Sequence, residues 1–127
     1  MSRTNMPQPT APPDLDALRP KVTPELLADM ARRIVEAFHP HRVILFGSHA
    51  YGAPHKDSDV DLLVVMDSDE RPAKRRMRVS PVARVPFLPM DVLVYTPAEI
   101  ETRLAMGDHF ITEILQRGQV LYDDGAR

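Results

Sequence analysis

The stretch VILFGSHAYGAPHKDSDVDLLVV, residues 43–65, decides the fold that the sequence predicts. It reads as an apolar strand over residues 43–46, a Gly47-Ser48 turn, a polar loop and a second apolar strand over residues 60–65. Asp59 and Asp61 stand at the entrance of the second strand. Because side chains alternate between the two faces of a strand, both carboxylates are expected on one face. Paired carboxylates of this kind suit a hard divalent cation such as Mg²⁺.

Gly47 and Ser48 are suited to binding an anion beside those acids. A glycine after a buried strand lets the chain turn sharply and brings backbone N–H groups close to an anion, and a helical turn after it would direct its positive end to the same place. The Ser48 hydroxyl adds a donor for a phosphate oxygen. Together the acids and the turn predict a pocket for a metal-bound polyphosphate.

Asp91 lies near the start of another apolar strand, MDVLVY at residues 90–95. An unpaired buried carboxylate would be costly there. Its side chain is therefore expected either at an exposed strand end or against a cation, and the two acids upstream favour the cation.

These residues resemble the signature of the DNA polymerase beta-like nucleotidyltransferase superfamily. The resemblance is carried by Gly47-Ser48, ten intervening residues, Asp59-Val60-Asp61 and the apolar run after them, and Asp91 fits the third carboxylate that the family has on a later strand. It covers residues 43–122 and is nearest to the minimal, MNT-type members, which are often paired with HEPN-domain proteins. The resemblance implies an α+β fold, a small mixed β-sheet with helices packed on it.

The resemblance also implies a division of roles. Asp59 and Asp61 would hold two Mg²⁺ ions about 3.5–4 Å apart, and Asp91 would complete the ion nearer the nucleophile and accept the proton of the nucleophile. Gly47 and Ser48 would hold the β- and γ-phosphates of a nucleoside triphosphate. Minimal members can transfer AMP from ATP to a tyrosine hydroxyl of a partner HEPN ribonuclease and silence it as antitoxins. We therefore expect a nucleotidyltransferase of that kind.

Two other functions stay open on the sequence alone. One is a non-catalytic antitoxin that covers its partner, and the other is transfer to a small hydroxylated molecule. Three converging acids favour the enzyme, because a pure binder has no physical need for them. His49 stands where matching family sequences often have arginine, which removes one cationic phosphate contact. It can donate to a phosphate or ribose instead, or be a surface histidine.

Size and composition indicate a single domain. The chain has 127 residues, no cysteine and a net charge of −2, with a pI near 6.2. These values exclude disulfides and thiolate metal sites, and they argue against a dedicated nucleic-acid binder. No apolar run approaches the length of a membrane span, so we expect a cytoplasmic protein with no membrane partner.

The domain is expected over residues 23–123. Residues 1–22 are rich in proline and predict a flexible arm, either a solvated tail or a docking peptide for a partner. Residues 124–127 are expected to form a frayed tail.

Capping signals predict the helices around the sheet. Thr23-Pro24-Glu25 begins a helix that ends at His39-Pro40, and Thr96-Pro97-Ala98-Glu99 is a capping box for a helix that reaches about Met106. A helix over residues 109–117 is expected to end at Gly118 in a left-handed conformation. Its expected buried residues are Phe110, Ile111, Ile114 and Leu115. Residues 120–122 read as a short edge strand.

A basic segment precedes the strand of Asp91. Six cations occur with no acid between them, namely Arg71, Lys74, Arg75, Arg76, Arg78 and Arg84. Residues 71–79 predict a helix with Ala73, Met77 and Val79 inward, followed by extended chain from Pro81. Such a run is usually a solvated helix face. The alternative is a patch that steers nucleotide, an acidic partner or RNA toward the acids.

Two other phosphate or metal motifs are excluded by single positions. Gly47 and Gly52 are spaced like the glycines of a P-loop, but Ala53-Pro54 stands where lysine and serine or threonine are required. Residues 57–61 open like an EF-hand loop, but Leu62 and Ser68 replace its glycine and glutamate.

Overall fold

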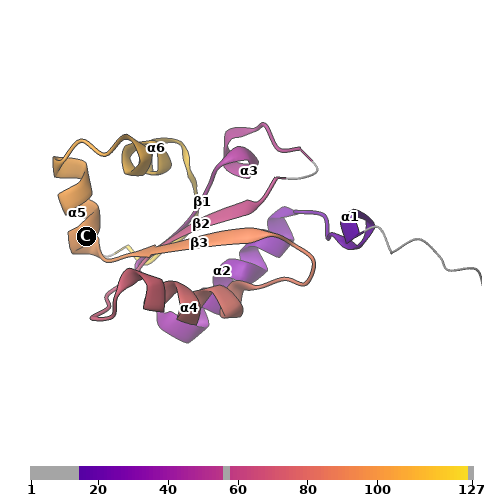
Figure 1. The fold of residues 1–127 in the computed structure, drawn as a ribbon, viewed down its shortest axis with the longest axis horizontal. Coiled ribbons are helices and arrows are strands. Elements are labelled where there is room, and N and C mark those ends of the chain that lie inside the picture. The colour runs from indigo at the N-terminus through magenta and orange to yellow at the C-terminus, as the bar shows by residue number, and fades with distance from the viewer. Residues whose placement is uncertain (1–14, 56–57, 126–127) are drawn as a thin grey trace, which may run out of the picture.

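A four-stranded mixed sheet forms the centre of the molecule (Figure 1). The structure is a computed structural model that describes residues 15–55 and 58–125. The strands are β1 (Arg42–Phe46), β2 (Val60–Val65), β3 (Met90–Tyr95) and β4 (Gln119–Asp123), in the spatial order β3-β2-β1-β4. β1 is antiparallel to β2 and β4, whereas β2 and β3 are parallel. The predicted strands and the predicted α+β class are confirmed.

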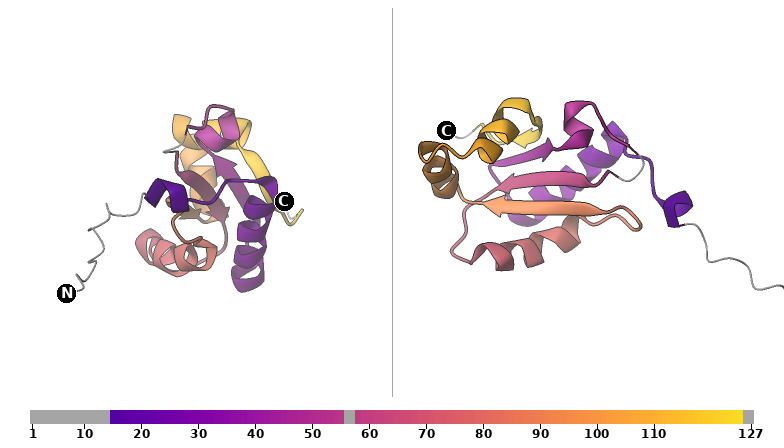
Figure 2. Two further views of the ribbon diagram at one scale, coloured as in Figure 1. Left: turned by 90° about the vertical axis from the view of Figure 1, so that its right-hand side faces the viewer. Right: turned by 45° about the horizontal axis from the view of Figure 1, so that its top comes forward.

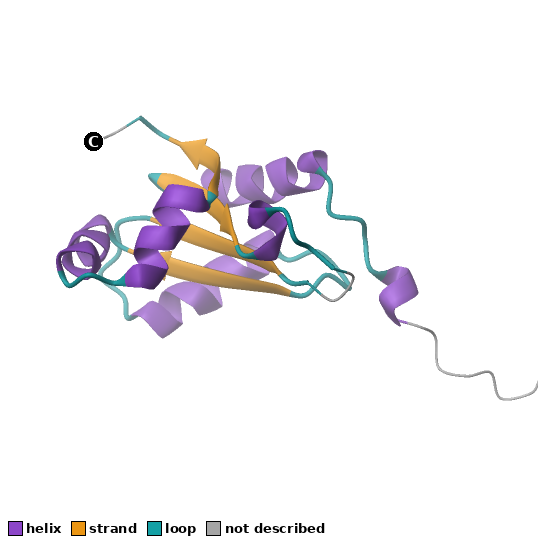
Figure 3. Cartoon of the chain, turned by 90° about the horizontal axis from the view of Figure 1, so that it is seen from above, coloured by secondary structure: helices purple, strands orange, loops and turns teal. Residues whose placement is uncertain are grey.

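Helices cover both faces of this sheet. α2 (Pro24–Phe38) and α4 (Pro72–Ala83) pack on one face. α6 (His109–Arg117) packs on the other, together with α3 (Ser48–Tyr51) and α5 (Pro97–Ala105). Figure 2 shows these layers from two further sides, and Figure 3 shows α3 and α6 in front of the strands. The short helix α1 (Leu15–Leu18) lies at the end of the sheet where α3 stands.

The alternating side chains of β2 divide between two cores. Leu62 and Val64 are buried against the layer of α2 and α4, whereas Leu63 and Val65 are buried with α6. Asp61 continues the second series because residues two apart share a face. It therefore lies on the face of α3 and α6, at the end of an apolar row.

The capping predictions are confirmed at α2 and α5. The Thr23 hydroxyl accepts a hydrogen bond from Leu26 N over 3.1 Å, and α2 ends at His39, which is left-handed with φ of 49°. At α5, Glu99 N donates to Thr96 Oγ1 over 3.2 Å, and Thr96 N donates to Glu99 Oε1 over 2.8 Å. These bonds satisfy N–H groups that the first turn leaves unpaired.

α4 departs from the prediction in its length. The helix continues through Pro81 to Ala83, where extended chain was expected. Proline removes one helical hydrogen bond, but Arg33 on α2 donates from Nη1 to Arg84 O over 3.0 Å and thereby binds the last turn to its neighbour. This tertiary contact offsets the local preference of the proline.

The buried face of α4 was predicted correctly at Val79 and wrongly at Ala73 and Met77. Arg75, Val79 and Ala83 face inward at intervals of four residues, while Ala73 is exposed and Met77 is 75% exposed. Arg75 can be buried because its Nη1 donates to Glu99 Oε1 on α5 over 2.5 Å and its Nε donates to Glu70 O over 2.8 Å. An interpretation that counted only apolar residues missed Arg75 and placed Ala73 and Met77 inward instead.

α6 buries Ile111 and Ile114 as predicted, but Phe110 is 50% exposed and meets Phe46 edge to face at 5.6 Å between ring centroids. Gly118 is extended, with φ of −65° and ψ of 156°, so the left-handed prediction is wrong. A Cβ at Gly118 would lie 2.6 Å from Ile44 Cγ2. Glycine is needed here because the helix end lies directly on β1.

The chain outside the sheet domain is described only in part. Residues 1–14 of the predicted proline-rich arm and residues 126–127 of the predicted tail lie outside the described residues. Within the arm, Val22, which precedes α2, packs against the core, and Arg19 donates to Ser58 O. No helix in the described ranges is long and apolar enough to cross a membrane.

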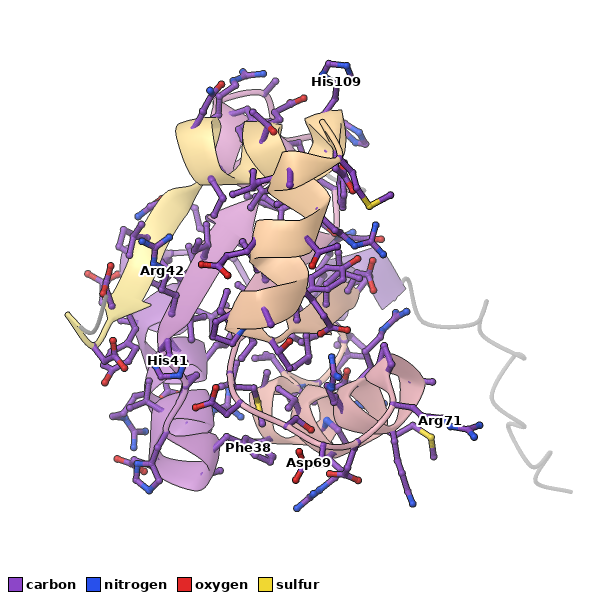
Figure 4. All side chains as sticks on the ribbon, turned by 90° about the vertical axis from the view of Figure 1, so that its left-hand side faces the viewer. Phe38, His41, Arg42, Asp69, Arg71 and His109 are labelled. Carbon is purple, nitrogen blue, oxygen red and sulfur yellow. The ribbon has the colours of Figure 1, made fainter. Side chains whose placement is uncertain are left out.

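His41 lies at the end of the sheet that is remote from α3 (Figure 4), where it contacts two acids. The His41 ring lies between two carboxylates, with Nε2 2.9 Å from Asp67 Oδ2 and Nδ1 2.8 Å from Asp124 Oδ2. Hydrogen bonds to Asp67 and Asp124 raise the pKa of His41. These contacts join the end of β2 to the segment that follows β4.

Candidate active site

The parallel register of β2 and β3 pairs Asp61 with Asp91. Neighbouring strands of a sheet lie about 4.8 Å apart, and paired residues of parallel strands share a face. Two acids that are distant in the sequence are therefore neighbours near the entrances of their strands. This relationship depends on strand order, which local sequence patterns do not contain.

Gly47 allows the Asp61 carboxylate to lie against the turn after β1. Its φ is 75°, a conformation that side chains disfavour, and a Cβ added there would overlap Asp61 Oδ2. The sequence indicated that glycine would let an anion approach the backbone here. In the structure, the carboxylate that lies close to Gly47 is that of Asp61. The Gly47-Ser48 turn is therefore directly beside the acids.

Asp61 lies in a concentration of negative charge. Burial raises the pKa of Asp61 to about 6, the carboxylates of Asp91 and Asp59 contribute to the increase, and His49 opposes it. Like charges held together at a partly buried position destabilise the ionised form. A cation bound among these oxygens would relieve that cost, and perturbed carboxylates of this kind are common at functional sites.

Asp59 is exposed and precedes the first residue of β2. The next residue, Val60, donates from its backbone N to Pro89 O over 3.1 Å, which fixes the chain at the approach to β3. Asp59 thus stands at the rim of the site, with Asp61 deeper and Asp91 beside it.

Asp91 meets a cation from the chain itself. Arg76 Nη2 on α4 donates to Asp91 Oδ1 over 2.7 Å, and the two side chains are 49% and 46% exposed. Asp91 is therefore half-exposed and paired with an arginine, a partner that the sequence did not indicate. Within residues 15–55 and 58–125, no three carboxylate or imidazole side chains are disposed to hold one metal ion together.

The turn after β1 leads into a single helical turn. Ala50 N and Tyr51 N each donate to Gly47 O over 3.0 Å. The backbone N–H groups of Ser48 and His49 precede these donors in the chain, and N–H groups at the start of a helix have no acceptor within the helix. His49 Nε2 lies 3.2 Å from Ser58 O, so the imidazole connects α3 to the segment that leads into Asp59. His49 itself is half-buried.

The chain matches the model of the nucleotidyltransferase domain family over residues 28–121, about three quarters of its length. It belongs to that family. The matched range contains the turn and all three acids of this nucleotidyltransferase domain. The match extends the resemblance found in the sequence, which began at residue 43, to include most of α2.

The fold is also shared with a solved structure. The crystal structure of a candidate nucleotidyltransferase from Sulfolobus solfataricus superposes with a TM-score of 0.52 and 22% sequence identity. The similarity covers 70% of this chain and 77% of that chain. At this identity the similarity shows the fold alone. A search of curated proteins found no match.

The donor set of the nucleotidyltransferase domain fits the divalent metal that such domains generally use with a nucleoside triphosphate. The acids offer only oxygen ligands, which suits Mg²⁺. Asp61 and Asp91 are paired by register, and the missing Cβ of Gly47 makes room for one carboxylate oxygen. Asp61 and Asp91 would contribute ligands to an ion together, and Asp59 would contribute from the rim. Because no three side chains of the described residues are disposed to hold one ion alone, the phosphates of the substrate would have to complete its coordination.

Arg76 is the site neighbour that sequence reasoning missed. It was seen only as one member of the basic segment, because no local signal shows that an arginine on α4 reaches Asp91 past the edge strand β3. The segment as a whole is not a simple solvated face. Arg75 is buried and Arg78 pairs with Glu70, whereas Arg71 projects away from the sheet (Figure 4).

Proposed function

We propose that this nucleotidyltransferase moves AMP from ATP to the hydroxyl of a tyrosine on a HEPN-type partner toxin, with Mg²⁺, and thereby acts as an antitoxin. The observation that carries the reaction class is the pairing of Asp61 with Asp91 beside the Gly47 turn. The choice of AMP, tyrosine and a HEPN partner rests on the resemblance to minimal, MNT-type members. A pair of this kind would meet ATP in the cytoplasm.

The reaction exchanges one phosphorus–oxygen bond for another. The acceptor oxygen bonds to the α-phosphorus of ATP, the bond from that phosphorus to the bridging oxygen breaks, and pyrophosphate leaves. Gly47 and Ser48 would bind the β- and γ-phosphates, and Asp91 would take the proton of the acceptor hydroxyl. Mg²⁺, held by the acids, would supply positive charge against the phosphate oxygens.

The exposure of the site supports an acceptor carried on a macromolecule. Asp91 and Arg76 are about half exposed, and Asp59 is exposed at the rim. An acceptor side chain on a protein surface can reach acids in such a shallow position. A deeply enclosed site would instead favour a small free acceptor.

The test is an incubation of the protein with Mg²⁺, ATP labelled at the α-phosphate and a candidate HEPN protein. Label on the partner is the expected result, and it should disappear when the acceptor tyrosine is changed to phenylalanine. Complex formation without label would favour a binding antitoxin, and label in a low-mass product would favour a small hydroxylated acceptor. The absence of Mg²⁺-dependent label in every fraction would contradict the enzyme.

The same assay needs a variant of the acids and a matched control. Asp61→Asn should abolish labelling, because it removes a carboxylate from the centre of the acid group. Asp69→Asn changes an exposed acid in the segment between β2 and α4 and should label the partner at the rate of the wild type.

A further inference from the structure

A cationic cavity lies beside the acids, between the segment before α2 and the region of α3. Figure 1 shows α1 and α3 at this end of the sheet. The volume of the cavity is about 500 Å³, and its lining includes Arg19, Lys21, His49, His55 and Ser58. Arginine and lysine carry permanent positive charge at neutral pH. No carboxylate lines the cavity among the residues that the structure describes. The positive charge of the lining therefore suits the binding of an anion.

The segment that carries the two permanent cations is held in place. Val22 packs against the core, and Thr23 caps α2. At the other end of the segment, the Arg19 guanidinium donates to Ser58 O. A guanidinium has five N–H donors, and this bond engages one of them. Arg19 and Lys21 are therefore positioned beside the cavity rather than carried on a freely moving chain.

The cavity and the acids share structural elements. His49 lines the cavity, and its charge acts on Asp61. Ser58 O accepts hydrogen bonds from both His49 and Arg19, and Ser58 is the residue before Asp59. A polyphosphate held at the acids would therefore have the cationic cavity as its neighbour.

We propose that Arg19 and Lys21 bind the terminal phosphates of the nucleoside triphosphate. This proposal rests on the proposed function and names the residues that complete its nucleotide site. The polyphosphate tail carries several negative charges, and hydrogen bonds from arginine and lysine to phosphate are among the stronger polar contacts in proteins. Arg19 and Lys21, on the segment before α2, supply the permanent positive charge of the cavity.

The segment before α2 then determines how strongly the protein prefers a nucleoside triphosphate to a nucleoside monophosphate. A nucleoside triphosphate reaches the cations with its terminal phosphates, whereas a nucleoside monophosphate does not. Arg19 and Lys21 should therefore contribute to the binding of ATP and of inorganic tripolyphosphate, and they should contribute little to the binding of AMP.

The test compares Arg19→Gln/Lys21→Gln with the wild type in full-length protein. Dissociation constants are measured by calorimetry with Mg²⁺ for ATP, tripolyphosphate and AMP. The double variant should bind ATP and tripolyphosphate about 10- to 100-fold more weakly and AMP with unchanged affinity. Arg32→Gln/Lys74→Gln removes the same charge from exposed helix positions and should bind all three ligands as the wild type does.

The outcomes separate this proposal from the proposed function. If the wild type prefers ATP to AMP and the double variant keeps that preference, the proposal is wrong and the proposed function stands. If the wild type binds ATP no better than AMP, the proposed function itself fails. Circular dichroism checks the fold, and the single variants Arg19→Gln and Lys21→Gln, each with a partial loss for ATP only, decide the case if the double variant does not fold.

Discussion

Arg76 Nη2 on α4 lies 2.7 Å from Asp91 Oδ1 on β3, so a fixed cation engages one of the three acids of the site. α4 packs on the opposite face of the sheet from the acids, and the arginine side chain reaches them past the edge strand. The guanidinium and a divalent cation would compete for the same carboxylate oxygen.

Replacement of Arg76 should strengthen metal binding. In Arg76→Gln the Asp91 carboxylate loses its competing cation, so the affinity for Mn²⁺, a stand-in for Mg²⁺ in calorimetry, should rise about 3- to 10-fold. Arg78→Gln is the matched control, because Arg78 pairs with Glu70 on the same helix. Equal or weaker metal binding by Arg76→Gln would mean that the arginine orients Asp91 for the metal instead of competing with it.

A methyl group at Gly47 should damage the site, and the same change at Gly52 should not. Both glycines have positive φ, 75° and 83°, so each alanine variant carries backbone strain of about 1 kcal/mol. At Gly47 the new Cβ also overlaps the Asp61 carboxylate, whereas nothing lies within 4 Å at Gly52. Metal titration should show a loss for Gly47→Ala only, and urea unfolding should show the larger destabilisation for that variant.

Wild-type metal affinity in Gly47→Ala would show that Asp61 can move away from the turn without consequence. That outcome would separate the glycine from the metal site and leave it as a turn residue alone.

The buried arginine of α4 should be essential for stability. Arg75→Met removes the arginine that donates to Glu99 and to the carbonyl of Glu70. Because Glu99 is 34% exposed and keeps its hydrogen bond from Thr96 N, the cost should be about 2 kcal/mol. Arg78→Met changes a 60% exposed arginine and should cost less than about 1 kcal/mol. Urea unfolding measures both, and equal effects would contradict the burial of Arg75.

The strands and the caps could be predicted because their signals are local. An apolar run such as residues 60–65 fits a buried strand whatever its neighbours are, and Thr96 and Glu99 form a capping box within four residues. The pairing of Asp61 with Asp91 depends on strand order, and the family resemblance indicated only that Asp91 belongs with the other two acids.

The errors concern partners that are distant in the sequence. Arg75 is buried because Glu99 lies 24 residues later, and α4 passes Pro81 because Arg33 holds its last turn. Gly118 is explained by contact with Ile44 instead of by its own φ. A pattern read along one helix contains none of these partners.

Neutralisation of Asp61 should stabilise the protein in the presence of a chelator. The pKa of Asp61 is raised from 3.8 to about 6, so the folded state binds this proton more tightly than the unfolded state does. The wild type should therefore lose stability as the pH rises from about 4 to about 6. After allowance for solvent screening, Asp61→Asn should be more stable by about 1 kcal/mol at pH 7.5, with the difference vanishing toward pH 4.

Urea unfolding in EDTA at several pH values measures this effect, and Asp69→Asn serves as the control on an exposed acid. A lower stability of Asp61→Asn at pH 7.5 would show that the ionised carboxylate is held by favourable contacts within the chain, which is the opposite of the arrangement described above.

We propose that Asp61 and Asp91, which the register of β2 and β3 pairs, form the site of nucleotidyl transfer. The test is the Mg²⁺-dependent transfer of AMP to the acceptor from ATP labelled at the α-phosphate. Its rate is measured for Asp61→Asn, Asp91→Asn and the control Asp69→Asn. Both site variants should be slower by about 100-fold or more, and the control should react at the wild-type rate. Transfer at the wild-type rate by either site variant would contradict the proposal.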